Sequence, residues 1–397
     1  MTNRTWQIRG RVAVVMVALS TVAAACSSSG GGAGGGGTDV NIALVEPFSG
    51  SVAYYGEYVN QSLTLAMDTV GDKPGGHKLS FKRFDDQCTP AKAQTAVRQA
   101  VGDSSISVVE GPGCTGAFLA AQPTLVQAKV PHVEIVFGST VTKGDDYIVQ
   151  AQTADDDLMN ALASYMATQN VVKLAIVNDT SGYSVDIQQT LDAGLAKTDI
   201  KPVSHITFTG GATDFSGQIS RLKSDHVTDV ALGCYDTDCG HFVKQAFQQG
   251  LNVRFWGPVT MQTEDFTKAI GSNYKDLVDD GKVIFASDFI PTNPSPVVQK
   301  FVKLWQSKYH SVPTTDIASL YVGHLTLLNA IKKISGSVTK EKLLPLLKAT
   351  SLSDTPLGNV SFDSSGKLKC PPLFIGDWSD GEPHLLKDLS PSCAGLK

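Results

Sequence analysis

The fold is set by a strand–helix–strand unit in residues 40–84, VNIALVEPFSGSVAYYGEYVNQSLTLAMDTVGDKPGGHKLSFKRF. The run 40–45 is almost continuously apolar, which is typical of a strand buried on both faces of a parallel sheet. Apolar residues then recur at spacings of three and four from Tyr55 to Val70, which predicts an amphipathic helix. Leu79 to Phe84 is the next predicted strand. The unit therefore predicts an α/β fold.

The same alternation continues outward from this unit. Further strands are predicted at 106–109, 131–136, 171–177, 203–208, 227–232, 253–256 and 283–286, separated by helices at 90–101, 117–127, 156–168, 185–196, 215–224 and 242–249. The pattern restarts after Tyr147 to Gln152, and 397 residues exceed the roughly 250 to 300 at which single cores stop growing. We therefore expect two lobes with right-handed crossovers.

Beyond the Pro-rich run 291–296 the chain is predicted to be helical. Three helices, at 297–309, 317–334 and 340–349, add no new parallel strand and are expected to cover an existing sheet. Two late antiparallel strands, 360–362 and 373–378, follow with their turn residues.

The first 38 residues have the features of an export signal and a tether. Arg4, Arg9 and Arg11 precede an acid-free apolar stretch, 12–25, whose roughly 14 residues at about 1.5 Å each are too few for a hydrocarbon core of about 30 Å. Residues 22–29, VAAACSSS, resemble the bacterial lipobox, although Ala23 stands where Leu is usual. We interpret 1–25 as a lipoprotein signal peptide, Cys26 as the lipidated residue and 26–38 as a Gly/Ser tether. The alternative is an ordinary secretory cleavage site.

Charge and composition exclude several classes of partner. Lys plus Arg number 33 and Asp plus Glu 38, a net charge of −5 with no basic concentration, so no nucleic-acid interface is expected. The composition, 42% hydrophobic and 18% charged, is that of a globular protein.

Seven cysteines suggest disulfides in an oxidising compartment. Assigning Cys26 to lipid leaves six, which fall into three local pairs: Cys88 with Cys114, Cys234 with Cys239, and Cys370 with Cys393. The competing interpretation is a metal site in 234–241, where two sulfurs, a histidine and two carboxylates lie close in sequence. Structural zinc normally takes four protein ligands and no second Cys/His cluster stands out, so we expect no metal and no cofactor.

A family resemblance is carried by short motifs in a fixed order. They are Pro47-Phe48-Ser49-Gly50, Tyr55-Gly56, Asp86-Gln87-Cys88-Thr89-Pro90, Gly111-Pro112-Gly113-Cys114-Thr115-Gly116, Gly138-Ser139-Thr140, Asn178-Asp179 through Gly182-Tyr183, Thr213-Asp214-Phe215, Gly233-Cys234-Tyr235, Trp256-Gly257-Pro258 and Gly358 to Phe362. Together they resemble the leucine/isoleucine/valine-binding family, the type I periplasmic solute-binding receptors of ABC importers. The likeness covers nearly all of the chain after the tether.

The resemblance implies a domain arrangement. Two Rossmann-like lobes with parallel sheets would be joined by a three-strand hinge, with a ligand in the cleft between them. The hinge crossings would lie near 150–153, 285–289 and 351–355, which assigns 39–151 plus 289–351 to the N-terminal lobe and 152–288 plus 352–397 to the C-terminal lobe. Cys88 and Cys114 also match the family's early disulfide.

The resemblance also implies a first-lobe ligand site. Thr115 and Gly116 precede a helix, where free backbone N–H groups favour an anion. In the family this turn and the Ser139-Thr140 loop hold the ligand's carboxylate. The alternative role of these residues is simple helix capping.

The cleft walls and the ammonium site are the remaining expectations. Tyr55, Tyr183 and Tyr235 match aromatic positions of the family's cleft, unless they are ordinary core residues. The family's amino-acid binders place a Glu after Gly-Pro, where this chain has Val259. Burying an ammonium group without an acidic partner is costly, so a neutral amide or a carboxylate is favoured as the ligand over an α-amino acid. The four acids that could substitute are Glu46, Glu110, Asp236 and Glu264.

These expectations describe a binding protein. We expect a monomeric lipoprotein on the extracytoplasmic face of the cell membrane that captures a small polar ligand and passes it to an ABC permease. The chain lacks the G-x-S-x-G, H-E-x-x-H, P-loop and G-x-G-x-x-G enzyme motifs. The alternatives are a ligand-sensing lipoprotein without a transport role and, more remotely, a thiol hydrolase that uses Cys114.

Overall fold

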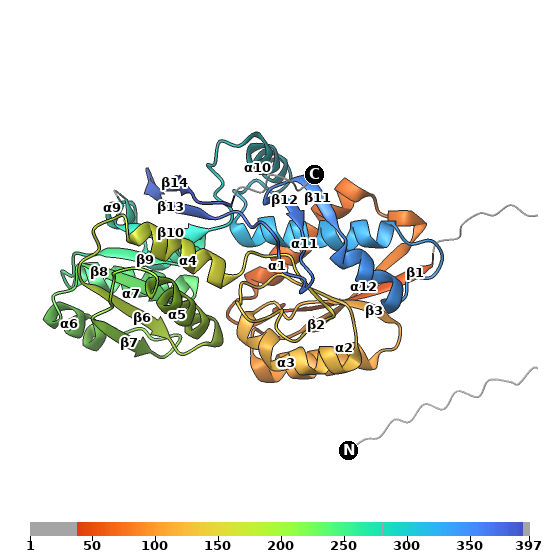
Figure 1. Cartoon of the computed structure of the whole chain (residues 1–397), viewed down its shortest axis with the longest axis horizontal. Helices are drawn as coiled ribbons and strands as arrows, with labels where there is room; N and C mark the ends of the chain where they lie inside the picture. The colour runs from red at the N-terminus through yellow and green to blue at the C-terminus, as the bar shows by residue number, and fades with distance from the viewer. Residues whose placement is uncertain (1–37, 273, 280, 392–397) are drawn as a thin grey trace, which may run out of the picture. The chain divides into compact units, whose positions relative to one another are not determined.

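The first sheet contains the strand–helix–strand unit that the sequence predicted. The computed structural model describes residues 38–272, 274–279 and 281–391. Five parallel strands form this sheet in the order β2-β1-β3-β4-β5 (Figure 1). Its elements are β1 (Asp39–Glu46), α1 (Tyr54–Val70), β2 (Lys78–Asp85), α2 (Pro90–Gly102), β3 (Ile106–Glu110), α3 (Thr115–Ala128), β4 (His132–Glu134) and β5 (Ile148–Gln150).

The second sheet has seven strands in the order β14-β13-β10-β9-β8-β6-β7. Five of them are parallel, and β13 and β14 add to the β10 edge in antiparallel pairs. Its elements are α4 (Asp155–Met166), β6 (Leu174–Asp179), α5 (Gly182–Leu195), β7 (Ser204–Phe208), α6 (Ser216–Ser224), β8 (Asp229–Gly233), α7 (Asp236–Gln248), β9 (Arg254–Gly257), α8 (Glu264–Ile270), α9 (Tyr274–Val278), β10 (Val283–Ser287), β13 (Phe374–Ser379) and β14 (Glu382–Asp388).

The two sheets have the same strand topology, because the order β7-β6-β8-β9-β10 in the second repeats the order β2-β1-β3-β4-β5 in the first. In such doubly wound sheets the strand order reverses between the first and third strands, here at β1/β3 and β6/β8. Ligands bind in the crevice outside the carboxyl ends of the strands at that point. The two Rossmann-like lobes expected from the sequence are therefore present, and each presents a switch point.

The first strand is buried on both faces. Ile42 and Leu44 pack in a cluster with α1 and α11 (Thr315–Lys332), whereas Ala43 and Val45 pack in a second cluster with α2 and α3. Helices α10 (Pro296–Tyr309) and α12 (Lys340–Lys348) join the first cluster, so the late helices cover an existing sheet as expected.

One predicted lobe boundary is wrong. Residues 351–368, including the hairpin of β11 (Ser351–Thr355) and β12 (Gly358–Ser361), belong to the first lobe, because Leu357, Val360 and Leu368 are part of its core. The Gln150 N–H donates to the Gly366 carbonyl oxygen, 2.8 Å. The third crossing therefore lies at about 369–373 instead of 351–355, and the second lobe resumes at β13 and not at residue 352.

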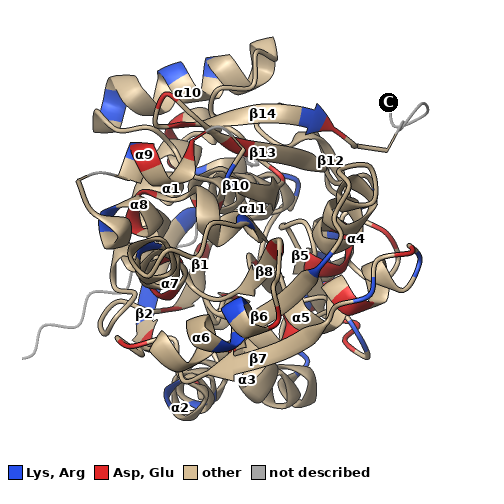
Figure 2. Ribbon diagram, turned by 90° about the vertical axis from the view of Figure 1, so that its left-hand side faces the viewer, with Lys and Arg blue, Asp and Glu red and all other residues tan. Residues whose placement is uncertain are grey.

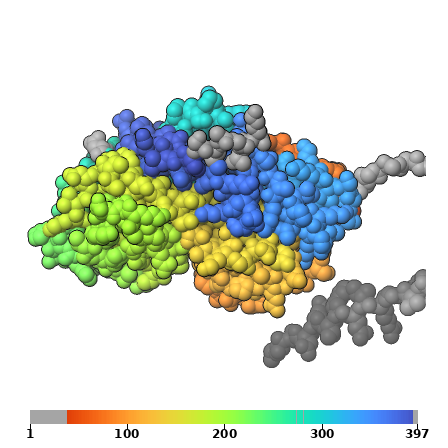
Figure 3. All heavy atoms as spheres, viewed as in Figure 1, coloured from red at the N-terminus to blue at the C-terminus, as the bar shows by residue number. Residues whose placement is uncertain are grey.

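The late strands then join the second lobe. Ile375 of β13 shares a cluster with Leu158 and Met159 of α4, and Figure 3 shows the dark-blue late segment beside the yellow segment of α4. At the hinge, the Asp288 carboxylate accepts hydrogen bonds from the Thr153 N–H and the Thr315 hydroxyl, which ties two crossing segments to α11.

Charged residues are spread over the described elements. In Figure 2 the Lys and Arg positions are interspersed with Asp and Glu positions on most of them, whereas α10 carries only Lys. Among the described helices, none combines the length and apolar character that crossing a bilayer requires.

Candidate ligand-binding site

A cavity lies where the switch points of the two sheets meet. It encloses about 570 Å³ of space between atoms, part of which is open solvent. It is lined by Val52, Tyr54, Tyr55, Gly113, Cys114, Thr115, Ile135, Val136, Phe137, Tyr183, Tyr235, Asp236, Val259, Thr260, Thr263 and Asp316. Nearly all of these residues follow the carboxyl ends of β1, β3, β4, β6, β8 and β9. Both lobes therefore contribute to one site.

Aromatic side chains form much of its wall. Tyr183 and Tyr235, both on the second lobe, lie with ring centroids 5.0 Å apart and planes inclined by 30°. The Tyr55 hydroxyl donates to the Ile135 carbonyl oxygen, 3.0 Å, so this ring is fixed by the protein itself. The three predicted tyrosines thus line the same cavity. Tyr54 and Phe137 also line it and were missed.

The Tyr183 hydroxyl is a polar group that lines the cavity. The residue is only 3% exposed, and its oxygen makes no well-aligned hydrogen bond with the described protein. The neighbouring hydroxyl of Thr260 donates instead to the Cys234 carbonyl oxygen, 2.8 Å. Thr260 is nevertheless close enough to interact with the Tyr183 hydroxyl. A buried hydroxyl that is not fully hydrogen-bonded costs free energy, so this group suits hydrogen bonding to a ligand.

Thr115, which was predicted to hold an anion, lies at the start of α3 and lines the cavity. This residue begins α3, which has no acidic residue in its first turn and no side-chain cap. The first N–H groups of a helix lack intrahelical partners, so this end of α3 offers donors and a positive dipole to the cavity. Gly116 does not line the cavity. It faces the second lobe, since a Cβ placed on Gly182 would lie 3.1 Å from the Gly116 Cα.

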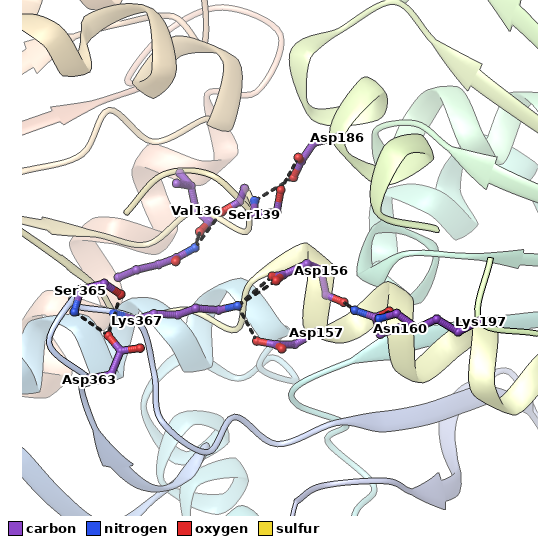
Figure 4. A network of polar contacts seen from close by, with 12 residues as sticks. Val136, Ser139, Asp156, Asp157, Asn160, Asp186, Lys197, Asp363, Ser365 and Lys367 are labelled. Carbon is purple, nitrogen blue, oxygen red and sulfur yellow. Dashed lines mark hydrogen bonds and ion pairs between the residues drawn. The ribbon is translucent and has the colours of Figure 1, made fainter. Parts of the chain in front are cut away.

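The Ser139-Thr140 loop does not line the cavity. The Ser139 hydroxyl donates to Asp186 Oδ1, 2.6 Å, and its N–H donates to Asp186 Oδ2, 2.8 Å (Figure 4). Asp186 lies on α5, so both bonds join the two lobes. Thr140 is exposed. The structure therefore places Ser139 in a contact between the lobes and leaves Thr140 outside the cavity lining.

The position of the missing acid is occupied by Val259, which is 2% exposed and lines the cavity. Of the four proposed substitutes, only Asp236 lines it as well. Glu46 is buried in the first lobe, Glu110 pairs with His324, and Glu264 is an exposed partner of Lys268.

A second carboxylate, Asp316, lines the same cavity from α11. Burial raises the pKa of Asp236 to about 6, although hydrogen bonding from Thr263 opposes the increase. Burial, followed by the negative charges of Asp236 and Asp288, raises the pKa of Asp316 to about 8. Asp316 lies at the start of a helix that the sequence predicted, but no local pattern indicated that it would face a cleft built from other segments.

Disulfides adjoin the site. Cys88 is bonded to Cys114 and Cys234 to Cys239, two of the three expected pairs. Cys370 is disulfide-bonded too, and its expected partner, Cys393, lies outside the described residues. The Cys234–Cys239 bond removes both thiolates from the metal-site interpretation, and the Cys88–Cys114 bond removes the nucleophile that a thiol hydrolase would need.

Known proteins share this architecture. A family model described as periplasmic binding protein matches residues 39–382. The Leu/Ile/Val-binding protein of Escherichia coli K12 is 25% identical over 345 residues, covering 86% of this chain and 91% of that protein. A leucine-binding protein from Thermotoga maritima has a TM-score of 0.81 at 21% identity, covering 89% of this chain and 99% of that one. A solute-binding protein from R. palustris in complex with benzoate also reaches 0.81, at 18% identity, covering 89% of this chain and 97% of that one.

Proposed function

The chain belongs to the periplasmic binding protein family, and we propose that it captures a small polar solute between its two lobes and delivers it to the permease of an ABC importer. The family acts outside the cytoplasm and consists of binding proteins, not enzymes. The observation that carries the proposal is the cavity itself, which both lobes line at their switch points.

Each side of the cavity has a proposed role. Thr115 and the free N–H groups at the start of α3 bind a carboxylate or carbonyl oxygen of the solute. Tyr55, Tyr183, Tyr235 and Val259 surround its less polar body. Solute contacts on both lobes favour the closed arrangement, in which Ser139 reaches Asp186 and Gly116 approaches Gly182.

The solute is expected to be small and to carry a hydrogen-bond acceptor. The curated relatives are named for binding leucine, isoleucine, valine, threonine and alanine. The aromatic walls and the few polar groups of this cavity suit small compounds such as amino acids, amides or small carboxylates.

A thermal-shift screen tests the function. The screen contains amino acids, ω-amino acids, amino-acid amides and the matching des-amino acids. A solute that binds only the folded protein stabilises it by roughly 2.7 kcal/mol at about 100 times Kd, so binders raise the melting temperature. Absence of any binder in the screen contradicts the proposal.

Thr115→Val tests the anchor for the solute. Losing a hydrogen bond to a charged group costs about 1.5 to 3 kcal/mol, so a hit that binds through an anionic group should weaken about 10- to 150-fold. Thr140→Val, an exposed position outside the cavity, is the matched control and should keep the affinity of the unmodified protein.

Membrane attachment is a separate proposal. The lipobox-like run supports a lipid anchor at Cys26, which lies outside the described residues, and the Gly/Ser tether would hold a monomeric binding protein near its permease. Fractionation after expression in a lipidating bacterium tests the anchor. Membrane association that persists in Cys26→Ala would contradict it.

A further inference from the structure

We propose that the solute carries a cationic ammonium group, and that Asp236 of the second lobe and Asp316 of the first lobe bind this group between them. The inference rests on the proposed solute-binding function and names the chemical class of the solute. It assigns the role of the acid expected after Gly257-Pro258 to two residues on other elements.

The charge of the cavity lining is the first observation. Its 16 residues include two carboxylates and no Lys, Arg or His. The Asp316 carboxylate forms no hydrogen bond or ion pair with any described residue, although it is only partly exposed. A carboxylate removed from bulk water without a cation is costly, so an ammonium is the complementary ligand group.

The helix N-termini around the cavity differ in their local charge. Asp236 lies in the first turn of α7 and Asp316 in the first turn of α11, where each offsets the positive end of its helix. The first turn of α3 holds no acid and remains positive toward the cavity. The lining therefore favours a cation at the two aspartates and an anion or carbonyl at Thr115.

First-turn acids commonly do no more than stabilise their helices. One feature separates this pair from that role: Asp236 and Asp316 come from opposite lobes and line one cavity. The Tyr54 hydroxyl from the first lobe lies 3.4 Å from Asp236 Oδ2, so this end of the cavity combines groups from both lobes.

Polar and aromatic groups complete the cation site. The buried Tyr183 hydroxyl lacks an aligned partner and lines the same cavity, as do the rings of Tyr54 and Tyr235. Aromatic faces attract an ammonium electrostatically, and hydroxyl oxygens accept its N–H groups. The elevated pKa values of both aspartates agree with two acids that have no cation beside them.

The arrangement also links solute charge to closure. Without a cation, closing the cleft brings two carboxyl groups of opposite lobes into one partly desolvated space, where they either repel each other as charges or must take up a proton. An ammonium between them removes this cost. Because a ligand shifts a conformational equilibrium only through its different affinity for the two states, a cationic solute closes the cleft more effectively than its neutral analogue.

The test uses compound pairs that differ only in the ammonium group: leucine with 4-methylpentanoate, 5-aminopentanoate with pentanoate, and 4-(aminomethyl)benzoate with 4-methylbenzoate. Any other hit of the thermal-shift screen is paired with its own des-amino analogue. We expect the ammonium compound of a binding pair to raise the melting temperature and its analogue to bind at least about 10-fold more weakly.

Substitutions of Asp236 and Asp316 test whether these two residues cause the preference for the ammonium compound. Asp316→Asn and Asp236→Asn should each weaken binding of the ammonium compound about 10- to 150-fold and leave binding of the des-amino compound unchanged or tighter. Asp199→Asn is the control, because this acid is exposed and does not line the cavity. It should keep the affinity of the unmodified protein.

The outcomes separate the two proposals. Des-amino or neutral compounds that bind as well as their ammonium partners overturn the cation site and leave the solute-binding function standing. Unchanged ammonium affinity in both asparagine variants overturns the residue assignment. If no compound of any charge binds, the proposed function fails, and the inference that rests on it fails with it.

Discussion

Ser139 of the first lobe donates two hydrogen bonds to Asp186 of the second, from its hydroxyl at 2.6 Å and from its backbone N–H at 2.8 Å. These bonds join the two lobes, and neither residue lines the cavity. We therefore expect them to stabilise the closed arrangement. In the same region Lys367 of the first-lobe segment bonds to Asp156 and Asp157 of α4, as Figure 4 shows.

The first prediction concerns this contact. Ser139→Ala removes the hydroxyl donor and keeps the N–H donor, so solute affinity should fall by about 10-fold through the loss of one charge-assisted hydrogen bond. Isothermal titration calorimetry measures the effect. Thr140→Ala is the neighbouring control and should bind normally, and equal affinities for the two variants would contradict a closure role for Ser139.

The second prediction concerns the two glycines that meet across the cleft. A Cβ on Gly182 would lie 3.1 Å from Gly116 Cα, which is too close without local movement, whereas a Cβ on Gly116 meets Gly182 at 3.7 Å. Gly182→Ala should therefore weaken solute binding several-fold by hindering closure, and Gly116→Ala should be tolerated. Isothermal titration calorimetry of the two variants measures the effect, and equal affinities would refute the steric argument.

The third prediction is a pH dependence. The pKa values of Asp236 and Asp316 are raised to about 6 and about 8 in the folded protein, above an unfolded value of about 3.9. The folded state thus binds more protons between about pH 4 and 8, and these two groups lower the stability of the solute-free protein as pH rises through that window. Their stabilising contribution is complete below about pH 4.

Asp316→Asn tests the assignment, since an amide resembles the protonated acid. The variant should melt at a higher temperature than the unmodified protein at pH 8.5, and the difference should shrink toward pH 5. Asp199→Asn, at an exposed position, serves as the comparison and should shift little at either pH. A difference that does not depend on pH would contradict the raised pKa.

The fourth prediction concerns the corrected lobe boundary. Gly366 has φ +91°, and a Cβ there would lie 2.2 Å from the Ile148 carbonyl oxygen. Gly366→Ala should therefore destabilise the protein by about 1 to 3 kcal/mol or more in urea unfolding. Gly358→Ala, at φ +75° with open space around it, imposes a similar backbone cost without the clash. Equal losses in the two variants would show that the contact with β5 contributes nothing.

The fifth prediction is the third disulfide. Cys370 is disulfide-bonded, and we predict Cys393 as its partner. Non-reducing peptide mapping should recover a peptide linking these residues, together with the Cys88–Cys114 and Cys234–Cys239 links. A peptide that joins Cys370 to any other cysteine would refute the predicted pair.

Local sequence patterns were sufficient to predict most of the helices and strands. The predicted strand 40–45 is β1 within one residue at each end, because burial on both faces leaves a continuous apolar run. The Thr89-Pro90 start of α2 also follows from local geometry, since proline suits the first helical turn. In contrast, β11 and β12 were assigned to the wrong lobe, because a short hairpin carries no signal for which core its apolar side chains enter.

The sequence by itself determined the α/β class, the two lobes, the family and the residues Thr115, Tyr55, Tyr183, Tyr235 and Val259, all of which reach the cavity. These follow from periodicity and from motifs that end individual strands. Only the tertiary structure decided that Ser139 bonds to Asp186 and that Asp236 and Asp316 share the cavity. The physical reason is that 80 positions of sequence separate the two aspartates, and their proximity arises only when both lobes close over one cleft. No local pattern encodes that closure.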